Sequence, residues 1–423
     1  MKKGLLGSTA LIGAATILSA AAGAAEAPTW KLTGNANFQL YWADQDDNLW
    51  TKQRVRTSSS VVTNIVTSWT DRTGTAGYGH DQDHDWYFGV DEAELQLNVS
   101  GAADNGLNYG FKIEINANTT DGTMADEVRL QFSGGWGTLQ LGDEDGAEDI
   151  MNFGGENLMG ATGGFDGDQD DYVVRLSEIN YYHESSNYYY ATYNWGTDPS
   201  TEAEHIAAPM YPTIAGDTSD GTKISYFSPR FSGFQVGASV TPTPNNGDDF
   251  KEDGSYENHI GIGANYDQSF GDLRIRASAV YSGASSNDTE IEDISAWSVG
   301  GIVGWGPFSL GANYTDNGDS GEPVTTFIDI EKSYWNVAAG FETGPFNFAL
   351  GYFVGTADLS FPNDMEFNSI IGDETTYEHV ALTADFTMAP GLGLYAEINL
   401  IEDTYGRVDQ GTTSFVAGAN VSF

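Results

Sequence analysis

Apolar and polar residues alternate with a period of two along almost the whole of this sequence. Between residues 30 and 42, one of the two alternating faces carries Leu32, Gly34, Ala36, Phe38, Leu40 and Trp42. Strict alternation over about ten residues indicates a β-strand with one apolar and one wet face. The pattern recurs at residues 107–118, 234–241, 259–266, 273–282, 308–314, 335–341, 346–354, 380–386, 394–400 and 415–423. The sequence therefore predicts an all-β fold.

The connections between these segments alternate between short and long. Short turns are predicted at residues 101–106, 134–137, 228–233, 267–271, 306–307, 343–345 and 388–391. Between the resulting hairpins lie long, polar and acidic connections, such as residues 243–257, 283–295, 315–333 and 356–376. Short turns at one end and long loops at the other are typical of a transmembrane antiparallel β-barrel of the outer membrane.

Aromatic residues gather at the ends of the predicted strands. They are Tyr41, Trp42, Trp86, Tyr87, Trp195, Tyr266, Tyr281, Trp297, Trp305, Tyr314 and Trp335. This distribution predicts two interfacial girdles around a lipid-facing band. A soluble β-sandwich would also show alternation, but it would have strand edges to protect, whereas a closed barrel has none.

The number of strands follows from the turns. Seven short turns, with one strand at each end of the chain, predict sixteen transmembrane strands. A further candidate hairpin at Ile179–Trp195 would raise the number to eighteen, or would form a hairpin within a folded-in loop. The β-like stretch Ser60–Trp69 is predicted to belong to an extracellular loop.

Charge and cysteine content exclude several classes of protein. The chain has 61 acidic against 17 basic residues and a net charge of −44, which excludes a nucleic-acid binder because phosphate recognition needs basic patches. The absence of cysteine excludes disulfides, thiolate metal sites and a cysteine nucleophile. An aromatic content of 13% and a hydrophobic content of 40% argue against disorder despite the acidity.

The N-terminus has the pattern of a secretory signal peptide. Lys2 and Lys3 precede a largely apolar stretch from Leu5 to Leu18, and small residues at Ala20–Ala25 fit a cleavage site. We therefore expect residues 1–25 to be a signal peptide and residues 26–423 to form a single barrel domain. No later stretch is apolar enough for a transmembrane helix.

The run Lys223–Ser239, KISYFSPRFSGFQVGAS, resembles the most distinctive hairpin of the Gram-negative general porin family, in particular of its alphaproteobacterial members. Shorter runs support the resemblance in family order: GTLQLG at 137–142, DNGL at 104–107 and APGL at 389–392. The matching elements extend through essentially the whole mature chain.

This resemblance implies sixteen strands, a homotrimer, and a third long loop that folds into the barrel as a constriction. It also implies that the barrel-assembly machinery recognises the terminal aromatic residue, Phe423. The expected surroundings are outer-membrane lipid and lipopolysaccharide.

The segment after Leu141 occupies the position of the family's constriction loop and is rich in acid. The candidate constriction residues are Asp143, Glu144, Asp145, Glu148 and Asp149. The resemblance implies that such acids face basic residues across the lumen and so create a transverse field. The alternation places the following candidates on the pore wall: Lys31, Glu94, Lys112, Glu114, Arg129, Lys223, Arg274 and Arg276. An excess of acid in a narrow pore is expected to enrich cations.

Metal binding and catalysis have little support in the sequence. Asp166, Asp168 and Asp170 have the spacing that begins a calcium loop, but they lack the glycine and the distal glutamate of an EF-hand. They are candidates for weak binding of Ca²⁺ or Mg²⁺, and no other cofactor is expected. Neither G-x-S-x-G nor H-E-x-x-H occurs, so no catalytic residue is predicted.

Together these features predict an outer-membrane porin of a Gram-negative bacterium, a water-filled channel for passive diffusion of small hydrophilic solutes and ions, with a preference for cations and no enzymatic activity. One alternative keeps the barrel but gives it a binding site for a specific solute, for which Tyr188 and Tyr190 are the only indication. A second alternative, from another class, is a secreted calcium-dependent β-protein such as a lectin or hydrolase.

Overall fold

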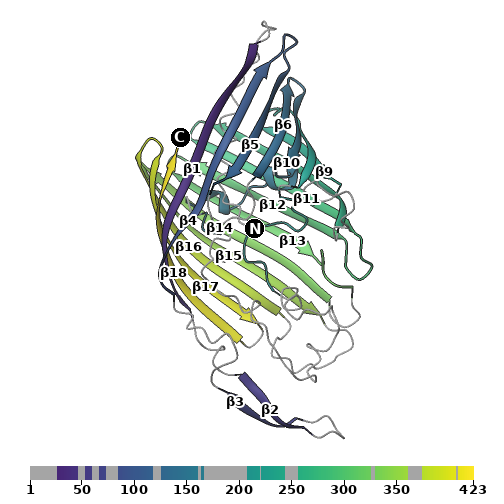
Figure 1. Cartoon of the computed structure of the whole chain (residues 1–423), viewed down its shortest axis with the longest axis vertical. Helices are drawn as coiled ribbons and strands as arrows, with labels where there is room; N and C mark the ends of the chain where they lie inside the picture. The colour runs from purple at the N-terminus through teal and green to yellow at the C-terminus, as the bar shows by residue number, and fades with distance from the viewer. Residues whose placement is uncertain are drawn as a thin grey trace.

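Sixteen antiparallel strands form a closed barrel (Figure 1). The computed structural model describes residues 26–45, 53–59, 66–72, 84–117, 125–160, 163–165, 207–219, 221–242, 256–324, 329–360, 374–405 and 408–423. The barrel strands are β1 (Glu26–Gln45), β4 (His84–Ala102), β5 (Asn108–Asn116), β6 (Ala125–Gly134), β7 (Gly137–Asp143), β8 (Thr222–Phe227), β9 (Phe234–Thr241), β10 (Tyr256–Phe270), β11 (Leu273–Ser286), β12 (Ile294–Trp305), β13 (Phe308–Gly318), β14 (Asp329–Thr343), β15 (Phe346–Ser360), β16 (Glu374–Ala389), β17 (Leu392–Tyr405) and β18 (Val408–Ser422).

The barrel closes through β1, which pairs with β4 on one side and with β18 on the other. At this seam the backbones of Gly34 and Phe423 exchange hydrogen bonds of 3.2 and 3.0 Å. The predicted sixteen strands are therefore confirmed. The candidate hairpin at Ile179–Trp195 and the candidate signal peptide at residues 1–25 lie outside the described residues.

Residues between β1 and β4 form a separate two-stranded sheet. Its strands are β2 (Gln53–Ser59) and β3 (Val66–Arg72), and Figure 1 shows them beyond the end of the barrel that carries the long loops. Of the predicted β-like stretch Ser60–Trp69, residues 66–69 belong to β3, outside the barrel wall, and residues 60–65 lie outside the described residues. In the described part of the chain, no helix is long and apolar enough to cross a membrane.

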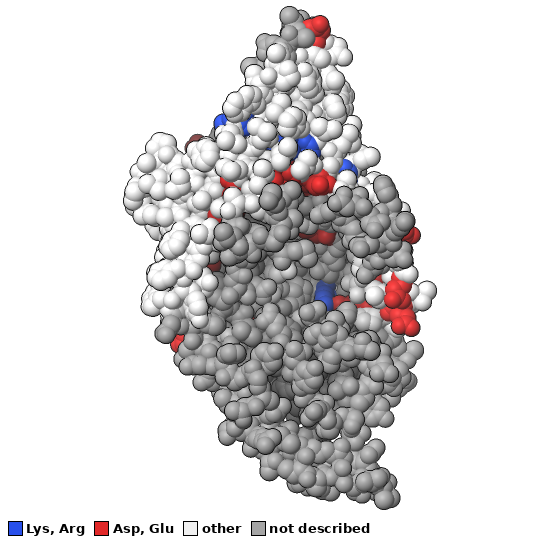
Figure 2. All heavy atoms as spheres, viewed as in Figure 1, with Lys and Arg blue, Asp and Glu red and all other residues white. Residues whose placement is uncertain are grey.

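The side chains along each strand alternate between exposed and buried, with the same period of two as the sequence pattern. On β10, Ile260 and Ile262 are exposed on the outer face, whereas Gly261, Gly263 and Asn265 are buried on the inner face. The outer positions are apolar because they face lipid, and the inner positions are mostly polar or small. On the view in Figure 2, the described surface toward the short-turn end is mostly uncharged.

Every predicted short turn has a counterpart between two strands, although β10 continues to Phe270, so its turn to β11 lies at residues 271–272 rather than 267–271. Gly306-Pro307 joins β12 to β13, and Gly344-Pro345 joins β14 to β15. Gly306 and Gly344 have φ values of 56° and 57°, a left-handed conformation that glycine adopts without the steric cost of a Cβ. These turns bring the ends of adjacent strands directly into register, with Trp305 opposite Phe308.

Several strands extend further toward the long loops than the alternation predicts. β14 begins at Asp329 rather than Trp335, and β15 continues to Ser360 rather than ending at Val354. The added residues include Glu331 and Asp358, which pair across the two strands. Outward positions near the long loops carry charged residues, so the apolar outer pattern ends before the hydrogen-bonded ladder does.

Aromatic side chains form two rows on the outer surface. The row near the short turns includes the pairs Phe308–Phe341, Phe346–Phe386 and Phe234–Tyr266, with ring centroids 5.0, 4.9 and 4.7 Å apart. The row near the long loops includes Trp297–Tyr314 and Trp335–Tyr352, at 5.5 and 5.4 Å. Trp297 belongs to the second row, and Trp305 lies opposite Phe308 of the first row. Both tryptophans are on β12, eight residues apart, so the rows are separated by about 26 Å along the strand. This matches the apolar band of a membrane barrel.

Candidate functional site

The segment that follows β7 runs along the inner wall of the barrel. It contains α2 (Ala147–Ile150) and the 3₁₀ helix η1 (Glu156–Leu158). Its backbone N–H groups donate to inward-facing side chains of four different strands. These bonds are Ala147 N to Ser239 Oγ (3.1 Å), Phe153 N to Ser278 Oγ (2.8 Å), Gly155 N to Asn336 Oδ1 (2.8 Å) and Gly160 N to Thr383 Oγ1 (3.0 Å). The segment therefore crosses the wall from β9 to β16.

Residues 207–219 follow the same wall. The backbone N–H of Ala215 donates to Asn317 Oδ1 of β13 at 2.9 Å, and Thr218 Oγ1 lies 3.3 Å from Thr241 Oγ1 of β9. We call the described residues 144–160, 163–165 and 207–219 the inner loop.

Glycines on the wall allow the inner loop to approach closely. A Cβ added at any of seven inward-facing glycines would lie closer than 3.0 Å to an atom of the inner loop. These are Gly237, Gly261, Gly263, Gly300, Gly311, Gly351 and Gly355. An inward-facing position normally carries a side chain. Because glycine has none, the backbone of the inner loop can approach the wall closely at these seven positions.

Replacing Gly300 with alanine is expected to weaken the docking of the inner loop by about 1–3 kcal/mol, because the new methyl group overlaps the carbonyl oxygen of Phe153. Limited proteolysis of the folded protein in detergent should then cut faster within residues 144–160. Gly304→Ala is the matched control on the same face of β12, since its Cβ would meet nothing nearer than Ser309 Oγ at 3.4 Å. Equal cleavage of the two variants would contradict the packing argument.

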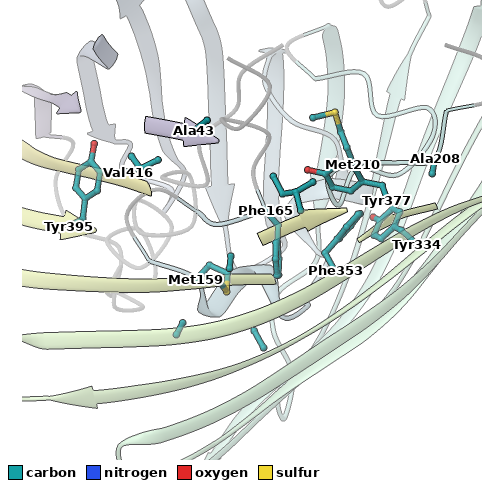
Figure 3. Packing of buried hydrophobic residues seen from close by; sticks show 14 residues of the cluster. Ala43, Met159, Phe165, Ala208, Met210, Tyr334, Phe353, Tyr377, Tyr395 and Val416 are labelled. Carbon is teal, nitrogen blue, oxygen red and sulfur yellow. The ribbon is translucent and has the colours of Figure 1, made fainter. Parts of the chain in front are cut away.

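Aromatic side chains hold the part of the inner loop around Phe165. Phe165 is fully buried, and its ring centroid lies 5.9 Å from that of Phe353 on β15 and 5.2 Å from that of His379 on β16. Figure 3 shows Phe165 beside Phe353 and near Tyr377 and Met210. His379 Nε2 lies 2.7 Å from Asn399 Oδ1, so a hydrogen bond between β16 and β17 fixes the imidazole that Phe165 contacts.

The five candidate constriction acids have different surroundings. Asp143 accepts a hydrogen bond from Thr222 Oγ1 at 2.5 Å, and Glu144 forms an ion pair with Arg129. One carboxylate oxygen of Asp145 lies within 4.8 Å of one carboxylate oxygen of Glu127 and one of Glu144.

The two acids of α2 point in different directions. Glu148 is 2% exposed and accepts a hydrogen bond from Ser239 Oγ at 2.9 Å, so its carboxyl group lies against the wall. Asp149 is exposed. Of the five acids, Asp149 is the one whose side chain is exposed.

The candidate wall residues all lie at inward-facing positions. Lys112 pairs with Glu114 and with Glu127, and Glu94 accepts a hydrogen bond from Gln96. Lys31 is exposed and lies on the inward side of β1, opposite Asn98.

The expectation that the loop acids face these bases across the lumen does not match the contacts. Lys223 Nζ donates to the carbonyl oxygen of Glu144, and Arg129 pairs with its carboxylate. In the strand register Arg129 lies opposite Gly142, which in turn lies opposite Lys223. Arg129 and Lys223 therefore lie next to the residues with which the inner loop begins.

Arg274 and Arg276 lie on β11, three strands from β8 in the barrel order. Arg274 donates to both carboxylate oxygens of Asp267, at 2.8 and 2.6 Å. The guanidinium carbon of Arg276 lies 5.4 Å from the centroid of the Phe153 ring, within the range of a cation–π contact.

Burial raises the pKa of two carboxyl groups in the inner loop. The pKa of Glu148 rises to about 7, mainly because of burial, although the hydrogen bonds that it accepts oppose the shift. Burial in the same way raises the pKa of Glu156 to about 7, next to Asn336 of the wall. Both groups are thus neutral in mildly acidic solution and become charged near neutrality.

Docking of the inner loop is therefore expected to weaken as pH rises through about 7. A pKa that is higher in the folded than in the unfolded state stabilises the folded state at low pH, and this stabilisation is lost as the group ionises. Protease protection of residues 144–160 should be stronger at pH 5 than at pH 8. Replacing both Glu148 and Glu156 with glutamine should remove that dependence, and a double variant that keeps it would contradict the assignment.

The sequence-predicted cation candidates Asp166, Asp168 and Asp170 lie outside the described residues. Within the described part, the carboxylates of Glu127, Glu144 and Asp145 gather at the base of the inner loop. The guanidinium of Arg129 already lies among them.

A closed antiparallel barrel with an apolar outer band, aromatic rows and a polar interior is the architecture of a channel across an outer membrane. A family model for Gram-negative porins matches residues 14–405, and the chain belongs to this family. It is an outer-membrane protein, so the alternative of a secreted calcium-dependent β-protein is wrong. No curated protein matches the sequence.

Solved outer-membrane proteins share the fold at low sequence identity. An anion-selective porin from Comamonas acidovorans is 13% identical, with a TM-score of 0.55 and coverage of 94% of this chain and 100% of that one. OmpT, an outer-membrane protein of Vibrio cholerae in its trimer form, is 12% identical, with a TM-score of 0.54 and the same coverage. Family and fold are those of a channel and not of an enzyme.

Two features of the site were not identified from the sequence. One is the pairing of Arg129 with Glu144. Hairpin counting at the turn Gly134–Gly137 could have placed Arg129 opposite Gly142, two residues before Glu144, but not the ion pair itself. The wall glycines were read only as part of the alternation, although glycine at inward positions of successive strands is a signal for close approach of another segment.

Proposed function

We propose that the channel prefers cations and that the inner loop narrows it. The observation that supports this proposal is the charge at the base of the inner loop. Inward-facing carboxylates there outnumber the basic residues: Glu94, Glu114, Glu127, Glu144 and Asp145 lie near Lys112, Arg129 and Lys223. Uncompensated negative charge in a narrow, low-dielectric passage concentrates cations.

The narrowing is supported by the position of the inner loop against strands β9 to β16. A segment that occupies one side of the lumen reduces its cross-section, and its exposed Asp149 adds negative charge to the passage. The Comamonas acidovorans porin is described as anion-selective, so the shared fold does not set the sign of selectivity. The side chains set it.

Reversal potentials in planar bilayers under a KCl gradient test the proposal. The wild-type channel should show a cation-selective potential. Neutralising Asp143, Glu144, Asp145, Glu148 and Asp149 together as amides should reduce it, because Glu144, Asp145 and Asp149 are among the acids that supply the charge. The control neutralises five acids of the long-loop end, namely Asp288, Glu290, Glu292, Asp293 and Asp319, and should change the potential much less. An anion-selective wild type, or equal effects of the two variants, would overturn the proposal.

We propose in addition that the protein is a homotrimer in contact with lipid and lipopolysaccharide, inserted by the barrel-assembly machinery through Phe423. The trimer form of the Vibrio cholerae protein supports the oligomeric state, and the exposed terminal aromatic ring supports the assembly signal. Weak binding of Ca²⁺ or Mg²⁺ at Asp166, Asp168 and Asp170 stays a prediction.

A further inference from the structure

A pocket of about 290 Å³ lies on the inner wall, between the inner loop and the short-turn end of the barrel. Arg274 and Arg276 of β11 line one side of it, and Glu342 of β14 and Asn347 of β15 line the other. Asn157 and Leu158 of η1, with Met159 after it, form its boundary toward the long-loop end.

The strand register explains why the wall is hollow here. Arg274 lies opposite Gly304, which lies opposite Ser309, which lies opposite Gly340. The positions of this row between Arg274 and β14 therefore carry no side chain larger than serine, whereas Arg276 lies opposite Ile302, which also lines the pocket. Three interstrand spacings separate β11 from β14, about 14 Å. Long charged side chains at both ends of this row enclose a polar space several ångströms wide.

Charges of both signs are available in the pocket. Among the described residues, no carboxylate lies within 4.0 Å of the Arg276 guanidinium, which contacts the face of Phe153. Asp267 lies opposite Arg276 in the strand register, but both of its carboxylate oxygens accept hydrogen bonds from Arg274. This distinguishes Arg276 from Lys112, Arg129 and Arg274, each of which has a carboxylate partner. Within the same part of the chain, no side-chain hydrogen bond or ion pair involves Glu342, and its backbone N–H donates to the carbonyl oxygen of Pro307.

We propose that this pocket binds small zwitterions, with the carboxylate at Arg276 and the ammonium group at Glu342. The proposal rests on the channel function proposed above. A guanidinium presents paired N–H donors that match a carboxylate, and a carboxylate accepts from an ammonium group. A solute with only one charge satisfies one side of the pocket and leaves its own charge beside a like charge on the other side. A zwitterion satisfies both sides.

Such a site suits a diffusion channel because binding is confined to two solvent-accessible charged contacts. Solutes have to leave a channel as readily as they enter it, so useful sites are weak. The zwitterion would bind on the short-turn side of the inner loop. A zwitterion that enters from the long-loop end reaches the pocket after the acidic start of the inner loop, and one that enters from the short-turn end reaches the pocket first. In an otherwise acidic pore, the unpaired Arg276 offers a carboxylate an attractive contact.

The experiment measures block of the single-channel potassium current by 6-aminohexanoate, a zwitterion whose charges are separated by a flexible chain. Hexanoate and hexylammonium carry the same charges singly and serve as matched probes. The zwitterion should reduce the current at lower concentration than either analogue. Arg276→Gln and Glu342→Gln should each raise its half-blocking concentration about tenfold, the loss expected for one charged hydrogen-bonded contact.

Lys31→Gln is the control variant. It removes one positive charge from β1, which lies eight positions from β11 in the sixteen-strand barrel order and therefore on the opposite wall. It should leave the zwitterion block unchanged. Equal block by hexanoate and 6-aminohexanoate, or an effect of Arg276→Gln no larger than that of Lys31→Gln, would overturn the proposal. Absence of any channel conductance would instead overturn the proposed function itself.

Discussion

Replacing Phe165 with alanine is expected to release residues 163–165 of the inner loop from β15 and β16. Phe165 is fully buried, and it contacts Phe353, His379 and the backbone at Gly351. Truncation of a buried phenylalanine costs about 3–5 kcal/mol, through lost apolar burial and the cavity that remains. The free energy is lost locally, so the sixteen-strand barrel should persist while the loop detaches.

Two measurements separate these outcomes. Heat-modifiable mobility on denaturing gels reports the barrel and should be unchanged. Single-channel recordings should show a noisier current, because a detached loop moves within the lumen. Phe231→Ala is the matched control, since Phe231 is 80% exposed at a short turn. A quiet current in the Phe165 variant, with the same protease resistance as wild type, would show that the aromatic contacts do not hold the loop.

The barrel could be predicted from the sequence because its determinants are local. The alternation in segments such as Phe234–Thr241 and the two-residue turn Gly306-Pro307 specify strands and hairpins without knowledge of distant contacts. A closed sheet then requires only that the first and last strands pair. The strand ends near the long loops could not be predicted, since polar residues such as Glu331 and Asp358 occupy both strand and loop.

The site was less predictable because it depends on contacts between distant segments. The alternation correctly placed Arg276 and Glu114 on the inner face. It could not show that Glu148 turns toward Ser239, a residue 91 positions away, instead of toward the lumen. Nor could it show which bases are already paired. Counting charges in the loop therefore overestimated the number of acids that the passage exposes, because burial and pairing are decided by tertiary packing.

The consequence concerns how the channel could select ions. Of the acids in α2 and η1, Glu148 and Glu156 are buried against the wall, and burial raises the pKa of each. They contribute less charge near neutrality than an exposed acid such as Asp149. The paired group around Arg129 is then the main concentration of inward-facing charge at the base of the inner loop.

The second large effect is expected at Arg129. Arg129→Gln removes the positive charge that pairs with Glu144, a residue only 8% exposed, and leaves it near Glu127 and Asp145. Breaking a largely buried ion pair costs about 3–5 kcal/mol, because one charge stays buried without its partner. Repulsion among the remaining carboxylates should push the base of the inner loop away from β6. Protease cleavage near residue 145 should accelerate, and the reversal potential should become more cation-selective.

The double variant Arg129→Gln/Glu144→Gln distinguishes an ion pair from a simple packing role. Removing both charges leaves no buried carboxylate without a partner at this position, so most of the lost protection should return, and the two changes should be strongly non-additive. The net charge of the double variant equals that of wild type, and its reversal potential should therefore approach the wild-type value. Additive losses of protection would mean that each side chain stabilises the loop independently. In that case the base of the inner loop would be held by the contact of Lys223 with the carbonyl oxygen of Glu144.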